Sequence, residues 1–189
     1  MSIEELIRKN RSYRRFYEDV EISNSQLKSL VNLARLSPSA RNMQSLRFKL
    51  INDKKLNDTI FPLLKWAGYL ENWDGPTEGE RPSAYIVILN DEELSNNYYC
   101  DDGLVTQSIM LGAVEKGFGG CIIAAINRPK FREILQIEEK YKIVHILALG
   151  KPKEEVVIEN IDSEGDIKYW RDNKATHHVP KRKLDDLII

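Results

Sequence analysis

Hydrophobic residues recur along this chain in two spacings, one typical of helices and one typical of strands. Helical spacing predicts five helices, which cover residues 2–9, 23–37, 56–67, 103–115 and 129–135. Short apolar runs predict four strands, at 48–51, 84–89, 121–126 and 143–149. The second of these runs is continuous and β-branched, which is typical of a strand buried on both faces. Because helices and strands alternate without an internal repeat, we expect an α+β fold of the three-layer α/β kind.

Local signals mark where some of these helices begin and how deeply they are buried. Ser2 with Glu5, and Ser23 with Gln26, form the capping-box pattern of a helix start. The helix at 103–115 is apolar on more than one face. That pattern predicts burial in the middle of the fold or in an interface.

The last forty residues differ from the rest of the chain, because they are charged and irregular until an apolar end. Residues 151–189 are therefore expected to form a C-terminal arm. Residues 187–189 could add a terminal strand, which would need a sheet to join. A second copy of the chain could bury this apolar end most easily, and packing of the end on its own subunit is the plainer alternative.

Composition and charge exclude several classes of protein. The 189 residues fit one domain that can bury a core without disulfides. A formal charge of -1 gives no argument for nucleic acid or a membrane surface, so a small molecule is the expected partner. Only Cys100 and Cys121 are present, which fits a reducing compartment. With no export signal and no long apolar run, we expect a cytoplasmic protein.

Two short polar segments carry the candidate chemistry. Arg11, Ser12 and Arg14 place guanidiniums and a hydroxyl just beyond the first helix, which is a donor set that a phosphate needs. Residues 37–44 form a loop of small residues and side-chain amides, suited to hydrogen-bonding a planar heterocycle at its edges. Taken singly, an arginine-rich turn is more often a solvated surface, and Ser-Pro-Ser-Ala is an ordinary way to turn the chain. Their order and spacing together suggest a phosphorylated, ring-bearing cofactor.

The pairing of Arg-Ser-x-Arg near the N-terminus with Ser-Pro-Ser-Ala-x-Asn-x-Gln after the second helix resembles the nitroreductase family of FMN-dependent oxidoreductases. The likeness extends through 102–108, 117–123 and 148–152 to basic residues near the C-terminus. It implies a single FMN-binding domain over 1–189, with a central mixed sheet flanked by helices. It also implies a homodimer with two FMN sites at the subunit interface and an arm, 151–189, exchanged with the partner subunit.

The resemblance further implies that each cofactor site is shared by two subunits. One subunit would hold the FMN phosphate and ribityl chain, and the loop at 37–44 would approach the same flavin from the other. Backbone at 119–122 would lie near the reactive side of the ring, and C-terminal basic residues would meet the phosphate. The expected cofactor-binding residues are Arg11, Ser12, Arg14, Pro38, Ser39, Ala40, Asn42, Gln44, Gly119, Gly120, Cys121, Ile122, Lys181 and Arg182. The chain departs from the family pattern at Asn10, where many members have Arg, and at Ser45, where Pro is usual.

On this resemblance the chain is an FMN-dependent NAD(P)H oxidoreductase. Hydride would pass from NAD(P)H through bound FMN to a small oxidised acceptor, such as a nitroaromatic or a quinone, by a ping-pong mechanism. The length supports that scheme, because 189 residues leave no room for a separate dinucleotide domain. No acid, base or nucleophile is expected, since the cofactor carries the hydride chemistry. The alternatives are reduction of an enone or of free flavin, dehalogenation, and a flavin-binding protein without turnover.

Two further motifs have plainer explanations than a ligand site. The glycines at 117–120 follow a helix and precede a strand, which is the reverse of a dinucleotide fingerprint, so a helix cap and a close backbone approach account for them. His177 and His178 are adjacent and have no partner at metal-ligand spacing, so no metal site is expected.

Side chains that could be taken for functional groups are also expected in the core. Trp66, Tyr69 and Trp73 are spaced for core or subunit packing, and a lid over the open face of the flavin is the alternative. Cys121 lies in an apolar run, which predicts a buried and inert thiol.

Overall fold

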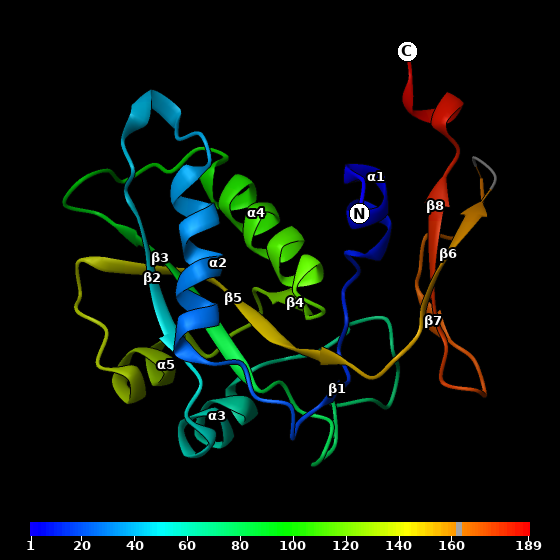
Figure 1. The fold of residues 1–189 in the computed structure, drawn as a ribbon, viewed down its shortest axis with the longest axis horizontal. Coiled ribbons are helices and arrows are strands. Elements are labelled where there is room, and N and C mark those ends of the chain that lie inside the picture. The colour runs from blue at the N-terminus through cyan, green and yellow to red at the C-terminus, as the bar shows by residue number, and fades with distance from the viewer. Residues whose placement is uncertain (162–163) are drawn as a thin grey trace.

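Helices and strands alternate along most of the chain in the computed structural model, which describes residues 1–161 and 164–189 (Figure 1). The helices are α1 (Ile3–Lys9), α2 (Asn24–Leu36), α3 (Lys54–Ile60), α4 (Asp101–Glu115) and α5 (Arg128–Leu135). The strands are β1 (Phe16–Tyr17), β2 (Leu46–Ile51), β3 (Ala84–Asp91), β4 (Gly119–Ile123), β5 (Tyr141–Pro152), β6 (Val156–Ile161), β7 (Trp170–Arg171) and β8 (His177–Arg182). Short 3-10 helices are η1 (Ala40–Asn42), η2 (Phe61–Leu63) and η3 (Leu184–Leu187).

The central sheet is organised around its longest strand, β5. Strands β3 and β4 both pair with β5, β2 pairs with β3, and β1 pairs with the last two residues of β5. All of these ladders are antiparallel. Ser12, which lies outside the named strands, forms an isolated parallel bridge with Gly120 of β4.

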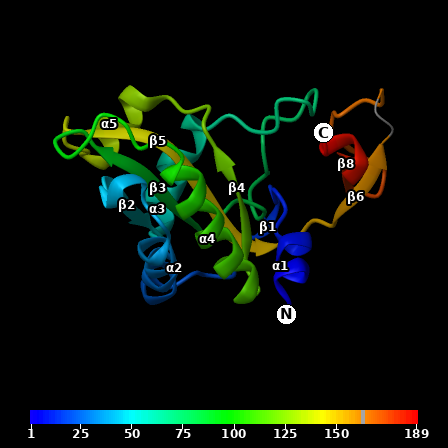
Figure 2. The same cartoon turned by 90° about the horizontal axis from the view of Figure 1, so that it is seen from above.

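Helices cover both faces of the sheet, so the expected three layers are confirmed (Figures 1 and 2). Along β3 the side chains alternate between two cores, as the pleat of a strand requires. Ile86 and Ile88 pack with residues of α2 and α4, whereas Val87 and Leu89 pack with residues of α3 and α5. Every residue of β3 is buried, which confirms the predicted strand with two covered faces.

Helix α4 packs beside α2 on one face of the sheet, and most of its length is buried in the middle of the fold, as predicted (Figure 1). Val105, Ile109 and Ala113 are buried in the core that α4 shares with α2. At Gly112 the two helices approach closely, because a Cβ there would lie 2.2 Å from Leu33 Cδ1. Gly117 ends the helix in a left-handed turn with a φ of 79°.

Both predicted capping boxes are present. The Ser2 hydroxyl accepts a hydrogen bond from the Glu5 amide, and the Glu5 carboxylate accepts one from the Ser2 amide. Ser23 and Gln26 make the same pair of bonds at the start of α2. These local signals therefore placed two helix starts correctly.

The predicted helix at 56–67 is wrong at both ends. Asp53 caps the helix by accepting a hydrogen bond from the Leu56 amide, so α3 begins at Lys54. It ends at Ile60, because Pro62 has no amide hydrogen to continue the ladder and the chain tightens into η2. Leu64 then pairs with Ile126 in an isolated bridge.

The predicted strand at 121–126 begins two residues too late and ends three residues too late, since β4 covers Gly119–Ile123. Gly119 and Gly120 pair with Gly150 and Leu149, so β4 begins earlier than its apolar run. Glycine lacks the side chain on which strand patterns rest, which is why the sequence did not show this start.

The last forty residues are not irregular, which corrects the sequence-based expectation. β8 pairs with β6 in parallel and with β7 antiparallel, and we name this three-stranded unit the C-terminal sheet. Figures 1 and 2 show it to one side of the main body. The predicted strand at 187–189 is not formed, because Leu187 ends η3 and the last two residues lie in neither a helix nor a strand. The arm contacts its own N-terminal segment through Glu154, Tyr169 and His177, whereas residues 187–189 stay exposed. Exchange of the arm with a partner subunit stays a prediction.

Candidate functional site

The segment after α1, residues 11–15, runs beside the edge of β4. Ser12 forms a parallel bridge with Gly120, and the Tyr13 amide donates to the Gly120 carbonyl at 3.0 Å. The Arg11 guanidinium donates through Nη2 to the Ile7 carbonyl at 2.8 Å, which ties it to the end of α1. Its Nε is buried and has no partner. Burial also lowers the pKa of Arg11, because desolvation disfavours the charged form.

Arg14 points toward the C-terminal sheet. Its Nη1 donates to the Ser12 carbonyl at 3.1 Å and lies 3.2 Å from His177 Nε2. The guanidinium carbon sits 4.8 Å from the centre of the Tyr169 ring. The next arginine has a structural role, since Arg15 makes a two-bond ion pair with Glu80 at 2.5 and 2.7 Å.

The loop at 37–44 is held by one carboxylate at the start of α4. Asp101 accepts hydrogen bonds from the Ser39 hydroxyl at 2.6 Å and from the Ala40 amide at 2.9 Å. The Ser39 hydroxyl in turn accepts from the Gln44 amide at 3.0 Å. Asp101 is buried, so these bonds replace the water that the carboxylate lost.

Backbone in this loop is left-handed at three residues that are not glycine. Arg41, Asn42 and Gln44 have φ values of 52°, 55° and 50°. Such angles are uncommon outside glycine and cluster at functional sites. The Gln44 side-chain amide donates to Asn42 Oδ1 at 3.1 Å, so the two amides hold each other at the loop surface.

A cleft of about 480 Å³ opens beside the loop. Apolar side chains of α2, α4 and β2 line it together with the polar residues of the loop. Its lining includes Val31, Pro38, Ser39, Gln44, Phe48 and Val105. An apolar cleft with a few convergent polar groups is the usual form of a small-molecule site.

Within one chain the two predicted half-sites lie apart. The loop at 37–44 is anchored at Asp101, whereas the first segment reaches α4 near Gln107, whose Oε1 accepts from the Asn10 side chain at 3.3 Å. Six residues of helix separate these points, which is about 9 Å along the axis. In the view of Figure 1 the loop and α1 lie on either side of α4.

The glycines of β4 are explained by packing. A Cβ on Gly119 would lie 2.6 Å from the Tyr13 ring, and one on Gly120 would lie 2.1 Å from the Ala148 carbonyl oxygen. Cys121 is buried as predicted, and desolvation raises the pKa of its thiol to about 12. Ile122 is 55% exposed and is the outward-facing residue of this strand.

The remaining predicted residues lie on the C-terminal sheet and beside it. Lys181 and Arg182 occupy the exposed end of β8. Trp66 is buried in the core, where it packs against Phe61 with ring centres 5.7 Å apart. Trp66 is therefore part of the core, as predicted.

Tyr69 and Trp73 instead reach the C-terminal sheet. The Tyr69 ring lies 5.0 Å from that of Tyr169, and the Arg171 guanidinium lies 4.7 Å from the Trp73 ring. These contacts give the loop before β3 a packing role against the arm.

Sequence reasoning missed two carboxylates that organise the site. Asp101 holds the loop at 37–44, and Glu154 holds residues of the first segment and of β7. Their partners are distant in sequence, so no local pattern marks them. Asp101 does stand at the start of a strongly predicted helix, where an acidic residue is favoured by the helix dipole.

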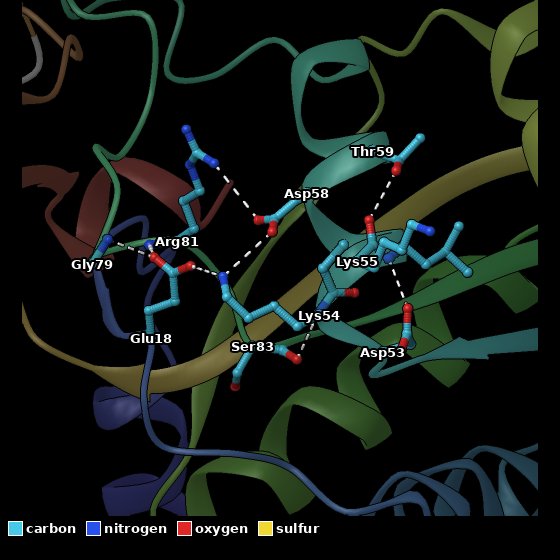
Figure 3. A network of polar contacts seen from close by, with 11 residues as sticks. Glu18, Asp53, Lys54, Lys55, Asp58, Thr59, Gly79, Arg81 and Ser83 are labelled. Atoms are coloured by element: carbon cyan, nitrogen blue, oxygen red, sulfur yellow. Dashed lines mark hydrogen bonds and ion pairs between the residues drawn. The ribbon is translucent and has the colours of Figure 1, made fainter.

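A second hollow, of about 580 Å³, lies beside α3 and holds a network whose charges are largely paired with one another (Figure 3). Glu18 accepts from Lys54 at 3.0 Å and from the Gly79 and Arg81 amides at 2.6 and 3.1 Å. Burial opposes the ionisation of Glu18, but these hydrogen bonds outweigh it and lower its pKa. We infer that this network stabilises the region around α3.

Two features are absent from residues 1–161 and 164–189. No group of three or more His, Cys, Asp or Glu side chains there is arranged to hold a metal ion. Across the same residues, no helix has the length and apolar character needed to span a membrane.

The donors present suit a flavin mononucleotide. Arg11 keeps a buried Nε without a partner, and Arg14 and Ser12 stand beside it on one continuous segment. Guanidiniums and hydroxyls are the usual phosphate donors, and the loop at 37–44 supplies amides for a ring. The residues therefore fit such a cofactor.

Comparison with known proteins agrees with this geometry. A family model described as "Nitroreductase family" matches residues 7–151. An Archaeoglobus fulgidus protein, provisionally named NADH dehydrogenase/NAD(P)H nitroreductase, is 28% identical over 149 residues, which is 75% of this chain and 80% of that protein. A Bacillus subtilis protein, provisionally named NAD(P)H nitroreductase YodC, is 21% identical over 180 residues, which is 78% of this chain and 88% of that protein.

Solved structures share the fold. A nitroreductase family protein from Clostridium novyi NT has a TM-score of 0.67 at 27% identity, covering 81% of this chain and 88% of its own. A provisionally named nitroreductase from Exiguobacterium sibiricum, solved in complex with FMN, has a TM-score of 0.68 at 22% identity, covering 81% of this chain and 89% of its own. Because the family model spans most of the sequence and the fold agrees, the chain belongs to the nitroreductase family.

Proposed function

We propose that this chain is an FMN-dependent oxidoreductase that takes reducing equivalents from NAD(P)H and passes them to a small oxidised acceptor, such as a nitroaromatic or a quinone. The family assignment and the NAD(P)H nitroreductase names of its relatives support the reaction class. The FMN complex of the Exiguobacterium protein supports the cofactor.

One observation carries the cofactor assignment. Arg11, Ser12 and Arg14 form a continuous donor segment fastened to the edge of β4, and Arg11 Nε is buried there without a partner. Leaving a buried donor unpaired costs free energy, so an anionic group at this place would remove that cost. Arg14 and the Ser12 hydroxyl would add charge-assisted and neutral bonds to the same group.

When bound, FMN would supply the hydride chemistry, and the chain supplies binding and orientation. Asn42 and Gln44 carry the amides that would bond the edges of the ring, on a loop fixed by Asp101. Backbone at 119–122 runs beside the first segment. Since the two half-sites lie apart in one chain, we propose that each site is completed in a homodimer, with donor and acceptor taking turns at one face.

Spectroscopy and stopped-flow kinetics test this proposal together. The purified protein is expected to show the visible absorption bands of a flavin, and NADH or NADPH is expected to bleach them in the absence of acceptor. Initial rates against both substrates should then give parallel double-reciprocal lines, because one planar site must serve donor and acceptor in turn. A bound flavin that stays oxidised with excess NADH and NADPH would contradict the proposed reaction and leave a flavin binder without this turnover.

A further inference from the structure

Arg14 is held by the C-terminal sheet as well as by its own segment. Its Nη1 lies 3.2 Å from His177 Nε2, and its guanidinium lies against the Tyr169 ring. The Tyr169 ring in turn lies 5.2 Å from the His177 ring. A strand and a connecting segment more than 150 residues away in sequence therefore surround this side chain.

Glu154 fixes the backbone of the same residue. Its side chain is fully buried, and its Oε1 accepts a hydrogen bond from the Arg14 amide. Its Oε2 accepts from Arg171 Nη2 at 2.9 Å. A buried carboxylate needs such partners, so the position of Arg14 depends on the strand that carries Arg171.

The contact with His177 determines which ring nitrogen carries the proton. Arginine can only donate hydrogen bonds, so His177 Nε2 must accept and be unprotonated. The proton of the neutral ring then belongs to Nδ1, which is buried without a partner. This arrangement uses His177, 1% exposed, as a fixed acceptor that orients the Arg14 guanidinium.

We propose that Glu154 and His177 are positioning residues for Arg14, through which the C-terminal sheet orients this guanidinium toward the phosphate group that it binds. The inference rests on the proposed function, because it concerns the same phosphate site. It goes further in giving the arm a second role in cofactor binding, separate from its exposed basic residues. Donors held by rigid supporting contacts bind more tightly than donors that must be ordered on binding.

Titration of FMN into the apo-protein, followed by flavin fluorescence, tests the roles of the two residues. Glu154→Gln and His177→Phe are each expected to weaken FMN binding about tenfold, the scale of one lost supporting hydrogen bond. His177→Gln should restore most of the affinity, because its amide oxygen can accept in place of Nε2. Glu159→Gln and His178→Phe are matched controls in the same sheet, since Glu159 pairs with His178 rather than with Arg14.

The outcomes separate this inference from the proposed function. If wild-type protein does not bind FMN, the proposed function is wrong. If wild-type protein binds FMN and Arg14→Ala weakens it, yet Glu154→Gln and His177→Phe bind as tightly as the two controls, the positioning inference is overturned. Equal loss in His177→Phe and His177→Gln would also overturn it, because a general packing defect would then explain both.

A measurement on the wild-type protein keeps the inference testable if the variants do not fold. Nitrogen NMR of the histidine side chains is expected to show His177 as the neutral ring with the proton on Nδ1 at neutral pH. The Arg14→Ala variant should shift the Nε2 resonance, since its hydrogen-bond donor is gone. A protonated Nε2 in the wild type would contradict the contact on which the argument stands.

Discussion

At the scale of single residues, the first segment combines donors for a ligand with donors already used by the fold. Arg15 and Arg11 show the difference. The Arg15 guanidinium pairs with Glu80, and this hydrogen bond is the main reason that the pKa of Glu80 is lowered to about 2. Arg11, in contrast, has an Nε without a partner. The sequence shows three similar arginines within five residues, and only their three-dimensional partners distinguish structural groups from those available to a ligand.

Replacing Arg14 by Ala, alone or with Arg11→Ala, is expected to weaken FMN binding while leaving the fold intact. Charge-assisted bonds to a phosphate contribute about 1.5 to 3 kcal/mol each, which is roughly ten- to a hundredfold in affinity. Calorimetric titration of the apo-protein with FMN measures the change. Arg8→Ala is the control, because Arg8 is an exposed partner of Glu4. Unchanged affinity in the double variant would contradict the phosphate assignment.

The lowered pKa of His177 predicts how the stability of the protein depends on pH. Desolvation, followed by the charges of Arg14, Arg171 and His178, lowers its folded pKa from 6.5 to about 4. Above 6.5 both the folded and unfolded forms are neutral. Between 6.5 and about 4 the unfolded chain binds a proton that the folded chain does not, so stability falls as pH falls through this window.

Urea unfolding at a series of pH values checks this expectation. Two other groups lie near His177. Glu154 accepts hydrogen bonds from Arg14 and Arg171, and the Tyr169 ring packs against the His177 ring. His177→Gln removes the titrating group and is expected to flatten the fall in the free energy of unfolding between pH 6.5 and about 4. An unchanged slope would show that other groups cause it.

At the scale of elements, a buried hydrogen bond fastens α4 to the centre of the sheet. Thr106 Oγ1 lies 2.8 Å from His145 Nε2, and both residues are buried. His145 Nδ1 lies 3.8 Å from Asp102 Oδ2. Burial lowers the pKa of His145, and Asp102 opposes that shift.

Thr106→Val is expected to destabilise the protein by about 1 to 3 kcal/mol, because it leaves a buried ring nitrogen without its partner. Thr59→Val is the control, since the Thr59 hydroxyl bonds its own exposed helix at the Lys55 carbonyl. Urea unfolding measures both variants. If the two losses are equal, the Thr106 hydroxyl has no special role.

Elements whose signals are local were predictable, and those whose pairing is distant were not. Capping residues placed α1 and α2, because Ser and its partner lie three positions apart. The apolar run of β3 was sufficient to predict a strand that is buried on both faces. The C-terminal sheet was missed, because β8 is polar and its parallel partner β6 begins 21 residues earlier. In the site, likewise, the donors were visible in the sequence but Glu154 was not.

At the scale of the whole molecule, apolar surface remains at both the arm and the helical face. Leu184, Leu187 and Ile188 are 70%, 65% and 67% exposed at the end of the chain. An apolar groove of about 420 Å³ runs along α1, α2 and α4. Contiguous exposed apolar surface commonly marks an interface between proteins.

Deleting residues 184–189 is expected to weaken both dimerisation and flavin retention. Burial of these side chains on a partner would contribute to association in proportion to the apolar area covered. Sedimentation velocity at micromolar concentration, with absorbance of the bound flavin, measures both properties. Ile167→Ser is the control, since Ile167 is an equally apolar side chain that is 54% exposed outside residues 184–189. A flavin-loaded monomer of the full chain would contradict the dimer.

The central place of β5 has a consequence for how the chain is made. Strand β3 is apolar along its length and is completed at residue 91, but β5, which covers one of its edges, ends at residue 152. The ribosome adds about 5 to 20 residues per second, so these 61 residues take roughly 3 to 12 s. During that interval β3 has only β2 as a sheet partner, and its other edge is open to foreign strands. Newly made chains of this protein are therefore expected to be most vulnerable to aggregation in the seconds before β5 is completed.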